Sequence, residues 1–580
     1  MGYLSSTFNP GNERQSMETS VIISFFGFTA AVALISWWKT RHDRHNTMDD
    51  YFMGGRSLTA GVIAGSLMLT NLSTEQLIGL NGVAFAEGFV AMAWETLAAI
   101  TLVVLALFYL PRYLSRALTT IPEFLEQRYD RGTRTMVNVL FLSGYVTILL
   151  PVVLYSGAVG ISGIFGVEEM LGVSEAQAIW ICVWSIGVIG SIYAVFGGLK
   201  AVAVSDTING MGLLVGGAMI PIFGLMAIGD GSFWQGLDIV YATNPDKFNA
   251  IGRADQSVPF STLFTGMMLV NMFYWCTNQC IVQRALAAEN LREGQKGVLL
   301  AGFLKLLGPV ILVLPGVIAF HIFGDTIAVG DKAYPKLVNT VLPPPLVGFF
   351  GAVLLGAILS SFNSGLNSAA TLFSVGLYKP YINPKATDRK VVVSGKFFAA
   401  ILAVISMLGA PLIMYADQGV FGHLQEVNGC YSIPILTIIL VGMFSKRVPP
   451  LAAKLGLIFG VSCYIVTQFI LQVELHFLHV MAILFVLNSG FMLLVGHFKP
   501  LAKPFEWKKI ETVDVRPWRF AWPVGMLICG ASITNYVLLS GASSYWPVPV
   551  VASILLAAIS VKKKPGVNNN SEPVGVSVEA

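Results

Sequence analysis

The sequence predicts an all-α membrane protein that crosses the bilayer many times. Of its 580 residues, 55% are hydrophobic and only 12% are charged, whereas a soluble protein carries about 25% charged residues. Apolar runs of about 18 residues or more recur along the chain, and each can cross a hydrocarbon core of about 30 Å as a helix. The runs are continuous rather than alternating, which excludes the strands of an outer-membrane barrel.

Fifteen of these apolar runs are candidate spans. In chain order they are 20–38, 61–80, 89–110, 137–164, 178–195, 203–228, 259–282, 298–320, 345–374, 396–413, 426–444, 453–472, 475–496, 520–540 and 546–561.

Positive charge predicts the orientation of these spans. Most of the 36 lysines and arginines fall in alternate junctions, such as "KTRHDRH" (39–45) and "HFKPLAKPFEWKK" (497–509). The positive-inside rule then places the N-terminus outside and the C-terminus in the cytoplasm. The first apolar run lacks a basic n-region and a small-residue cleavage site, so we expect a retained helix rather than a signal peptide.

Two of the predicted spans carry polar clusters at membrane depth. "TNLSTEQ" (70–76) interrupts the span 61–80, and "NMFYWCTNQ" (271–279) interrupts the span 259–282, five spans later. Matching interruptions at this spacing indicate an inverted-repeat transporter with broken helices at the bilayer midplane. Exposed backbone at that depth is tolerated only against protein, water or ligand. The alternative is that both polar faces pack against neighbouring helices.

Beyond the first two positions of any predicted span, four charged residues lie inside the spans: Glu75, Glu95, Asp206 and Lys305. Each costs at least about 2.5–3.5 kcal/mol at the centre of a helix, and such residues usually line a cavity or an ion pathway. Lys305 could instead extend to the cytoplasmic interface. Asp206 lies close to the end of its span, where a structural role at the helix terminus is an alternative to a role in an ion pathway.

A strip of small oxygen-bearing side chains lies in "GAILSSFNSGLNSAATLFS" (356–374). Small residues alone would suit close helix packing. Neutral hydroxyls together with unwound carbonyls near residues 69–72 would instead suit a monovalent ion such as sodium, because the strip offers no carboxylate pair for calcium.

Six longer motifs resemble the solute:sodium symporter family, in particular its bacterial sodium/glucose (galactose) cotransporter-like branch. They are "DDYFMGGRSL" (49–58), "SLMLTNLSTEQLIGL" (66–80), "TIPEFLEQRYD" (120–130), "FGGLKAVAVSDTING" (196–210), "NMFYWCTNQCIVQRALAAENLREGQKG" (271–297) and "SSFNSGLNSAATLFS" (360–374). The resemblance implies a LeuT-type core of two inverted five-helix repeats. These repeats would be 61–228 and 259–444, with 1–60 and 445–561 peripheral, 229–258 an extracellular loop and 562–580 a cytoplasmic tail.

The resemblance also implies a sodium site and a sugar site. The sodium ligands would be the carbonyls of Leu69, Leu72 and Ala357 and the hydroxyls of Ser360 and Ser361, with Asp206 on the ion's exit path. Tyr274 and Trp275 would form the inner gate. Six residues would contact the sugar: Asn71, Gln76, Glu95, Asn271, Lys305 and Gln425.

Three positions remain without a family role. Ala98 stands where related sugar carriers have a serine, and Trp94 stands where they have a tyrosine at the outer rim. These departures leave the identity of the sugar open. Glu75 has no role in the family pattern, and a capping role at the broken helix is the expectation.

The sequence therefore predicts a symporter of the bacterial inner membrane that uses sodium to import a monosaccharide by alternating access. The alternative is a sodium symporter for another polar solute, such as a carboxylate or a modified sugar, because Lys305 could bind an anion. Proton coupling through Glu75 is a lesser possibility. We expect no enzymatic activity, because the histidines lie near span ends and cannot serve a serine nucleophile at depth. The expected partners are a small sugar and the lipid bilayer, with no nucleic acid and no obligate protein partner.

Overall fold

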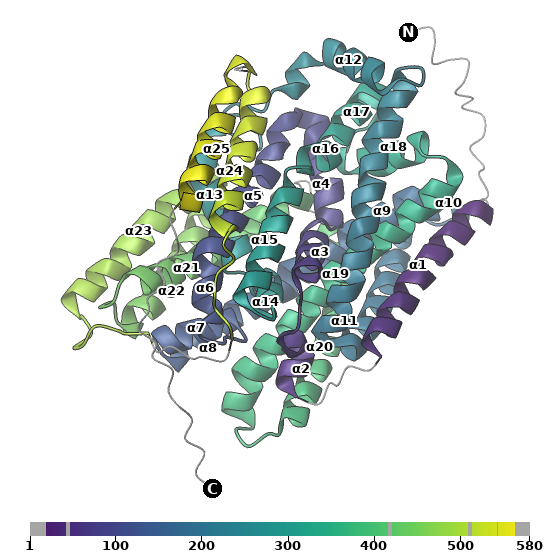
Figure 1. Cartoon of the computed structure of the whole chain (residues 1–580). Coiled ribbons are helices and arrows are strands. Elements are labelled where there is room, and N and C mark those ends of the chain that lie inside the picture. Colours follow the sequence, from purple (N-terminus) through teal and green to yellow (C-terminus); the bar gives the residue numbers. More distant parts are fainter. Residues whose placement is uncertain (1–18, 42–46, 416–419, 508–512, 542, 563–580) are drawn as a thin grey trace.

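The computed structural model describes residues 19–41, 47–415, 420–507, 513–541 and 543–562. This part of the chain is helical apart from turns and one isolated bridge between Leu58 and Ala288 (Figure 1). The expected extracellular segment before residue 19 and the expected cytoplasmic tail after residue 562 lie outside the described residues.

The described part of the first half of the chain contributes twelve α-helices. They are α1 (Thr19–Thr40), α2 (Met48–Met53), α3 (Ala60–Asn71), α4 (Thr74–Glu87), α5 (Ala93–Val104), α6 (Leu110–Leu114), α7 (Ile121–Arg128), α8 (Arg131–Gly144), α9 (Leu150–Phe165), α10 (Val167–Leu171), α11 (Glu175–Ile228) and α12 (Phe233–Thr243).

The described part of the second half adds thirteen more. They are α13 (Gly266–Cys276), α14 (Gln279–Leu286), α15 (Leu291–Lys305), α16 (Gly308–Leu312), α17 (Leu314–Phe323), α18 (Ala333–Val341), α19 (Pro344–Phe373), α20 (Asp388–Gly409), α21 (Val420–Phe444), α22 (Pro450–Ile465), α23 (Phe477–Phe498), α24 (Ala521–Leu538) and α25 (Pro547–Lys562).

Within the described residues, twelve helical segments are long and apolar enough to cross a membrane, and one bent pair makes a thirteenth. Each of these matches one of the fifteen predicted spans. The two remaining predictions, 61–80 and 259–282, correspond to helices that are too short to span alone. The chain is therefore a multi-pass α-helical membrane protein, and the difference in number comes from the two interrupted spans.

Both interrupted spans are broken helices, as the polar clusters predict. The first ends as α3 at Asn71 and resumes as α4 at Thr74, and Leu72 between them has a non-helical ψ of 60°. The second ends as α13 at Cys276 and resumes as α14 at Gln279. The Asn278 side chain accepts a hydrogen bond from the backbone N–H of Cys280 and so caps the second half-helix.

A third break was not expected. The predicted span 298–320 is a pair of helical segments, Leu291–Lys305 and Gly308–Phe323, which meet at an angle of 50°. Gly308 and Pro309 follow the bend, and proline lacks the N–H that would continue the helical hydrogen bonds. The bend places Lys305 at the end of α15.

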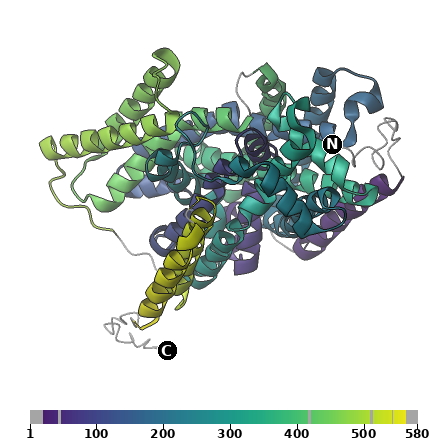
Figure 2. The ribbon, with the colours of Figure 1, turned by 90° about the horizontal axis from the view of Figure 1, so that it is seen from above.

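The core surrounds the two broken helices. Helix α3 packs against α11 and α15, α4 packs against α17, and α13 packs against α5 and α21. Seen from above in Figure 2, α1 and the pair α24–α25 lie at the edge of the molecule. Large apolar side chains on α1, α23 and α25 are exposed, as expected for helix faces in contact with lipid.

Candidate functional site

Three of the predicted sugar-contacting residues form one buried network. Asn71 ends α3, Glu95 lies in the first turn of α5, and Lys305 ends α15. The Lys305 ammonium donates hydrogen bonds to Glu95 Oε2, at 2.6 Å, and to Asn71 Oδ1. The Lys305 and Glu95 side chains are 0% and 2% exposed. Lys305 therefore does not extend to the interface.

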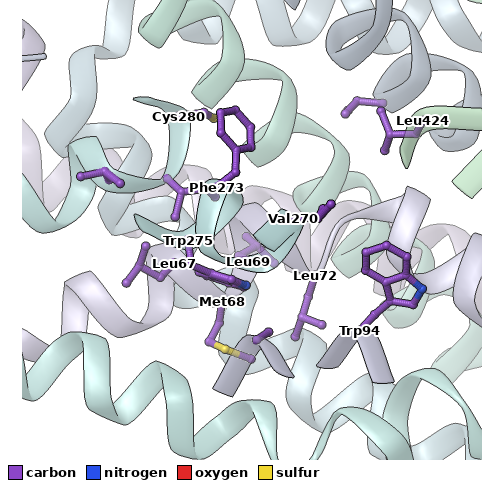
Figure 3. Close-up of a cluster of buried hydrophobic side chains, with 14 of the residues drawn as sticks. Leu67, Met68, Leu69, Leu72, Trp94, Val270, Phe273, Trp275, Cys280 and Leu424 are labelled. Carbon is purple, nitrogen blue, oxygen red and sulfur yellow. The ribbon is translucent and has the colours of Figure 1, made fainter. Parts of the chain in front are cut away.

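The predicted gate residues lie against this network. The Lys305 ammonium lies 5.4 Å from the centroid of the Trp275 ring, a distance at which a cation is attracted to an aromatic face. The Tyr274 and Trp275 rings meet edge to face, and the Tyr274 hydroxyl lies close to the Asn71 side chain. Figure 3 shows Trp275 surrounded by apolar side chains of α3, including Met68 and Leu69.

Aromatic side chains close another side of the network. The rings of Trp94 and Phe421 meet edge to face at 5.2 Å. Helix α21 begins there in close contact with α4, because a Cβ on Gly79 would lie only 2.6 Å from Phe421 Cβ. Trp94 and Phe421 are both buried. The network itself joins α3, α5 and α15 and lies against Trp275 of α13, while Trp94, next to Glu95 in the chain, connects α5 to α21.

The other three predicted sugar contacts lie on α4, α13 and α21 but do not take part in the hydrogen bonds of the network. Asn271 is buried and donates to the Met267 carbonyl of its own helix at 3.1 Å. Gln76 and Gln425 are half-buried, and the buried Oε1 of Gln76 has no hydrogen-bond partner among the described residues. Their role as solute contacts stays a prediction.

The helix break changes the backbone bonding around the predicted sodium ligands. In a continuous helix the Ser73 N–H would bond to Leu69, but it bonds to the Asn71 carbonyl at 2.8 Å. Similarly, the Gln76 N–H bonds to Ser73 at 3.1 Å rather than to Leu72. The carbonyl oxygens of Leu69 and Leu72 thus lose their helical partners, as an ion site built from unwound backbone requires.

The predicted hydroxyl ligands lie across from this break. Ser361 Oγ donates to the Thr70 carbonyl at 3.1 Å, which joins α19 to the end of α3. Ser360 Oγ is buried and has no hydrogen-bond partner that meets normal geometry in the described part of the chain. Ala357, the remaining predicted ligand, is fully buried one turn earlier on α19. The structure brings α3 and α19 together where the sequence predicts the ion.

A buried charge cluster adjoins this region. Asp206 Oδ2 accepts a hydrogen bond from Ser66 at 2.7 Å and lies 3.8 Å from the Arg284 guanidinium. Arg284 also donates to Ser66 at 2.8 Å and to Ser364 on the serine strip. The charge of Asp206 is thus balanced by Arg284 within the core, and Asp206 does not lie at a solvated helix end.

Glu75 remains apart from both clusters. It is 5% exposed, lies in the first turn of α4, and its Oε2 has no hydrogen-bond partner within the described chain. A carboxylate in the first turn interacts favourably with the positive end of the helix dipole. The capping role expected from the sequence stays a prediction.

A comparison with protein-family models identifies the family of this chain. Residues 51–460 match the model described as "Sodium:solute symporter family". The chain belongs to the sodium:solute symporter family. The symporter is therefore a transporter rather than an enzyme, and it couples the movement of a solute to sodium.

Curated relatives agree with this assignment. The symporter is 48% identical to the "Uncharacterized symporter YidK" of Escherichia coli (strain K12). The 529 aligned residues cover 91% of this chain and 92% of the relative. It is 32% identical over 474 residues to the sodium/glucose cotransporter of Vibrio parahaemolyticus, covering 77% and 85% of the two chains. It is 30% identical over 486 residues to the mouse (Mus musculus) sodium/myo-inositol cotransporter 2, covering 78% and 70%.

A solved structure confirms the fold. The symporter superposes on the outward-open, substrate-bound structure of a Na⁺-coupled sialic acid symporter with a TM-score of 0.70, covering 83% of this chain and 97% of the other. The two sequences are 20% identical, so the likeness concerns the fold alone. The LeuT-type core predicted from the sequence is thus confirmed, whereas the repeat boundaries 61–228 and 259–444 stay a prediction.

Sequence reasoning missed the position of Arg284 in the symporter. Its charge suggested a cytoplasmic junction, yet its side chain is 1% exposed and paired with Asp206. Helix α14 has only eight residues, from Gln279 to Leu286. So short a helix offers no periodic pattern that could mark the buried face. The proximity of Arg284 to the polar cluster at 271–279 is the one sequence signal that could have found it.

Proposed function

We propose that the symporter imports a neutral monosaccharide of hexose type together with sodium. The observation that carries this proposal is the ion pair between Lys305 and Glu95, which lies beside Asn71 and Trp275. A site with hydrogen-bond donors, acceptors and an aromatic face, but no net charge, suits a ring of hydroxyls.

The pairing of Lys305 argues against the alternative substrate, a carboxylate. An anion would have to displace Glu95 from the ammonium at 2.6 Å and leave that carboxylate buried without its partner. A hydroxyl can instead accept from Lys305 and donate to Glu95 without separating the charges. The relatives named for glucose and myo-inositol act on neutral polyols, which supports the same choice.

Coupling would follow from the position of the predicted ion site. Sodium held between the α3–α4 break and Ser360 and Ser361 would fix the end of α3, where Asn71 takes part in the solute site. The ion can favour solute binding only if it binds one conformation better than the other. Its proposed role is to stabilise the outward-open arrangement, and Asp206 would lie on its way to the cytoplasm.

The proposed location is the bacterial inner membrane, with the N-terminus outside and the C-terminus in the cytoplasm. The distribution of lysine and arginine supports this orientation. The similarity to the Escherichia coli symporter, which extends over 91% of this chain, supports the location in the bacterial inner membrane.

Uptake into proteoliposomes tests the proposal. Radiolabelled hexoses, myo-inositol and a hexuronate would be offered with an inward sodium gradient, and again with potassium in place of sodium. We expect accumulation of at least one neutral sugar that requires sodium. Ser361→Ala should abolish the sodium requirement or the uptake. Ser406→Ala, which removes a buried hydroxyl bonded only within α20, should leave both intact.

Three results would contradict the proposal. Accumulation that does not need sodium would refute the coupling. Selective uptake of the hexuronate over every neutral sugar would favour the carboxylate alternative. Unchanged sugar uptake after Gln76→Ala would remove Gln76 from the proposed solute site.

A further inference from the structure

A cavity of about 160 Å³ that shares no lining residue with the predicted solute and ion sites lies where three segments of the chain meet. These segments are the α6–α7 junction, the end of α21 and the stretch 499–507, which all lie toward the lower left of Figure 1. The cavity is lined by Arg112, Arg116, Phe124, Gly442, Met443, Ser445, Lys446, Phe505 and Trp507. All three segments are ones whose charge predicts a cytoplasmic location.

The lining of this cavity is strongly basic. Arg112, Arg116 and Lys446 contribute three positive charges, and none of the lining residues is acidic. Nearby carboxylates are engaged elsewhere: Glu123 accepts from the Thr119 N–H at 2.8 Å, and Glu126 pairs with Arg134. The cavity therefore holds positive charge that protein groups do not neutralise.

Glu506 is the acidic residue nearest to the lining in sequence, between Phe505 and Trp507. Its side chain is exposed, and it forms no ion pair with the lining cations in the described part of the chain. It therefore does not supply the missing negative charge.

Arg116 is the residue that argues most directly for an anion in this cavity. Its side chain is 8% exposed, and its buried Nε has no hydrogen-bond partner among the described residues. Burial lowers the pKa of Arg116 to about 10, and repulsion from Arg112 acts in the same direction. The guanidinium still carries its charge at neutral pH. A buried, charged donor without an acceptor costs at least about 1–3 kcal/mol.

Aromatic rings hold the Arg116 guanidinium in place. Its central carbon lies 3.9 Å from the centroid of the Trp507 ring, which itself stacks on Phe124 at 4.9 Å. The Nη1 of Arg116 donates to the Arg112 carbonyl, so the edge formed by Nε and Nη2 is the one left for a planar, bidentate contact with oxygen atoms.

Carbonyl oxygens at the end of α21 would repel an anion, but Arg128 already binds them. Its Nε donates to Gly442 at 2.8 Å and its Nη2 donates to Ser445 at 2.6 Å. The backbone N–H of Phe505 bonds to Lys446 at 2.8 Å and fixes the third wall. The cavity is thus an ordered basic site rather than a loose group of surface cations.

We propose that this cavity binds a phosphate group. Arginine guanidinium groups and a lysine match phosphate oxygens, and basic pockets at the cytoplasmic ends of membrane helices suit lipid head groups. The volume, roughly five times that of a liquid water molecule, can hold a phosphate with its oxygens. The phosphate is carried either by an anionic phospholipid or by a soluble anion, and it would connect the α6–α7 junction to α21.

Thermal unfolding of the full chain in lipid nanodiscs tests this site. Three conditions are compared at equal ionic strength: phosphatidylcholine alone, phosphatidylcholine with phosphatidylglycerol, and phosphatidylcholine with inorganic phosphate in the buffer. A rise in Tm with phosphatidylglycerol alone identifies a lipid head group, and a rise with inorganic phosphate identifies a soluble anion. Native mass spectrometry of the purified protein then reports whether an anionic lipid remains bound.

Variants that remove positive charge from the lining test whether the rise in Tm comes from binding in this cavity. Arg116→Gln and the double change Arg112→Gln with Lys446→Gln should each weaken binding at least about tenfold, as expected for the loss of a charged hydrogen bond. The double variant changes two exposed side chains and keeps the packing, so it remains informative if Arg116→Gln fails to fold. Lys503→Gln is the matched control, because Lys503 is exposed on the same stretch but does not line the cavity.

Two outcomes would overturn the proposal. One is the absence of a Tm rise in both the lipid and the phosphate conditions. The other is an equal loss of binding in Lys503→Gln and in the cavity variants, which would show diffuse attraction to basic charge. Neither outcome bears on sugar uptake, so this test is independent of the proposed transport function.

Discussion

At the scale of single residues, two pairs of opposite charge lie inside the described part of the symporter. Lys305 pairs with Glu95 and Arg284 pairs with Asp206, and all four side chains are at most 2% exposed. A buried pair gains little net stability over an apolar substitute, but losing one partner leaves an uncompensated charge. The pairs are therefore better explained by function and specificity than by stability.

Removal of one charge from the Lys305–Glu95 pair should destabilise the symporter strongly. We expect Lys305→Met or Glu95→Gln alone to cost about 3–5 kcal/mol, because either change leaves a buried group without its partner. The double variant Lys305→Met with Glu95→Gln should recover much of that loss. Thermal unfolding followed by tryptophan fluorescence would measure all three.

The same variants separate stability from transport. The double variant should fold and yet fail to accumulate sugar, because the charged donor and acceptor are both gone. Additive losses in the double variant, with no recovery, would show that the two side chains do not interact energetically.

At the scale of helices, junctions are stabilised by side chains that act on helix ends. Asp130 accepts from the Thr133 N–H at 2.8 Å and so caps α8, while Lys454 at the start of α22 donates to it at 2.6 Å. Partial burial acts to raise the pKa of Asp130, but the hydrogen bonds from Lys454 and Thr133 outweigh it and hold the pKa below its usual range.

Substitution of Asp130 should separate its two contributions. Asp130→Ala should cost about 1 kcal/mol for the lost helix cap, in addition to the ion pair with Lys454 that it also removes. Asp130→Asn keeps a good capping residue but loses the ion pair, which is partly exposed and worth at most about 1 kcal/mol. Equal losses in the two variants would contradict this division.

The pH dependence provides a check on Asp130. Because its folded pKa is depressed, its contribution is complete above the unfolded value of about 3.9 and is lost as the pH falls through the folded pKa. The difference in Tm between the wild type and Asp130→Asn should therefore be constant near neutral pH and shrink under acid conditions. A difference that grows on acidification would refute the assignment.

Helices α4 and α21 approach each other closely at Gly79. A Cβ at this position would lie 2.6 Å from Phe421 Cβ, so Gly79→Val should push α4 and α21 apart. Because α4 and α21 carry Gln76 and Gln425 of the proposed solute site, we expect a higher KM for sugar with a smaller change in maximal rate. Gly490→Val, at an open position on α23, is the control. An unchanged KM would show that this contact does not shape the site.

At the scale of the whole molecule, sodium should stabilise the fold by mass action. A ligand at about 100 times its Kd adds about 2.7 kcal/mol to the folded state. Replacement of sodium by potassium should therefore lower the Tm of the wild type and leave that of Ser361→Ala unchanged. An equal response of both proteins to sodium would place the ion elsewhere.

Much of the architecture is predictable from the amino-acid sequence, because membrane solvation restricts the chain so strongly. Every long apolar run from 20–38 to 546–561 is helical, and both polar interruptions, at 70–76 and 271–279, are breaks between helices. Lipid offers no hydrogen bonds, so an apolar run must be helical and a polar interruption must face protein or ligand. The bend after Lys305 was missed, because Gly308 and Pro309 alone do not show whether a membrane helix kinks.

The amino-acid sequence is enough to specify the helices, the two breaks and the residue types available for sodium and sugar. Tertiary packing decides which charges meet: Lys305 with Glu95 across 210 positions, and Arg284 with Asp206. It also decides that Gln76, Asn271 and Gln425 stay outside the charged network and that basic residues from two distant segments line one cavity. The physical reason is that solvation acts on each segment independently, whereas partners for buried charges are set by how helices far apart in sequence pack together.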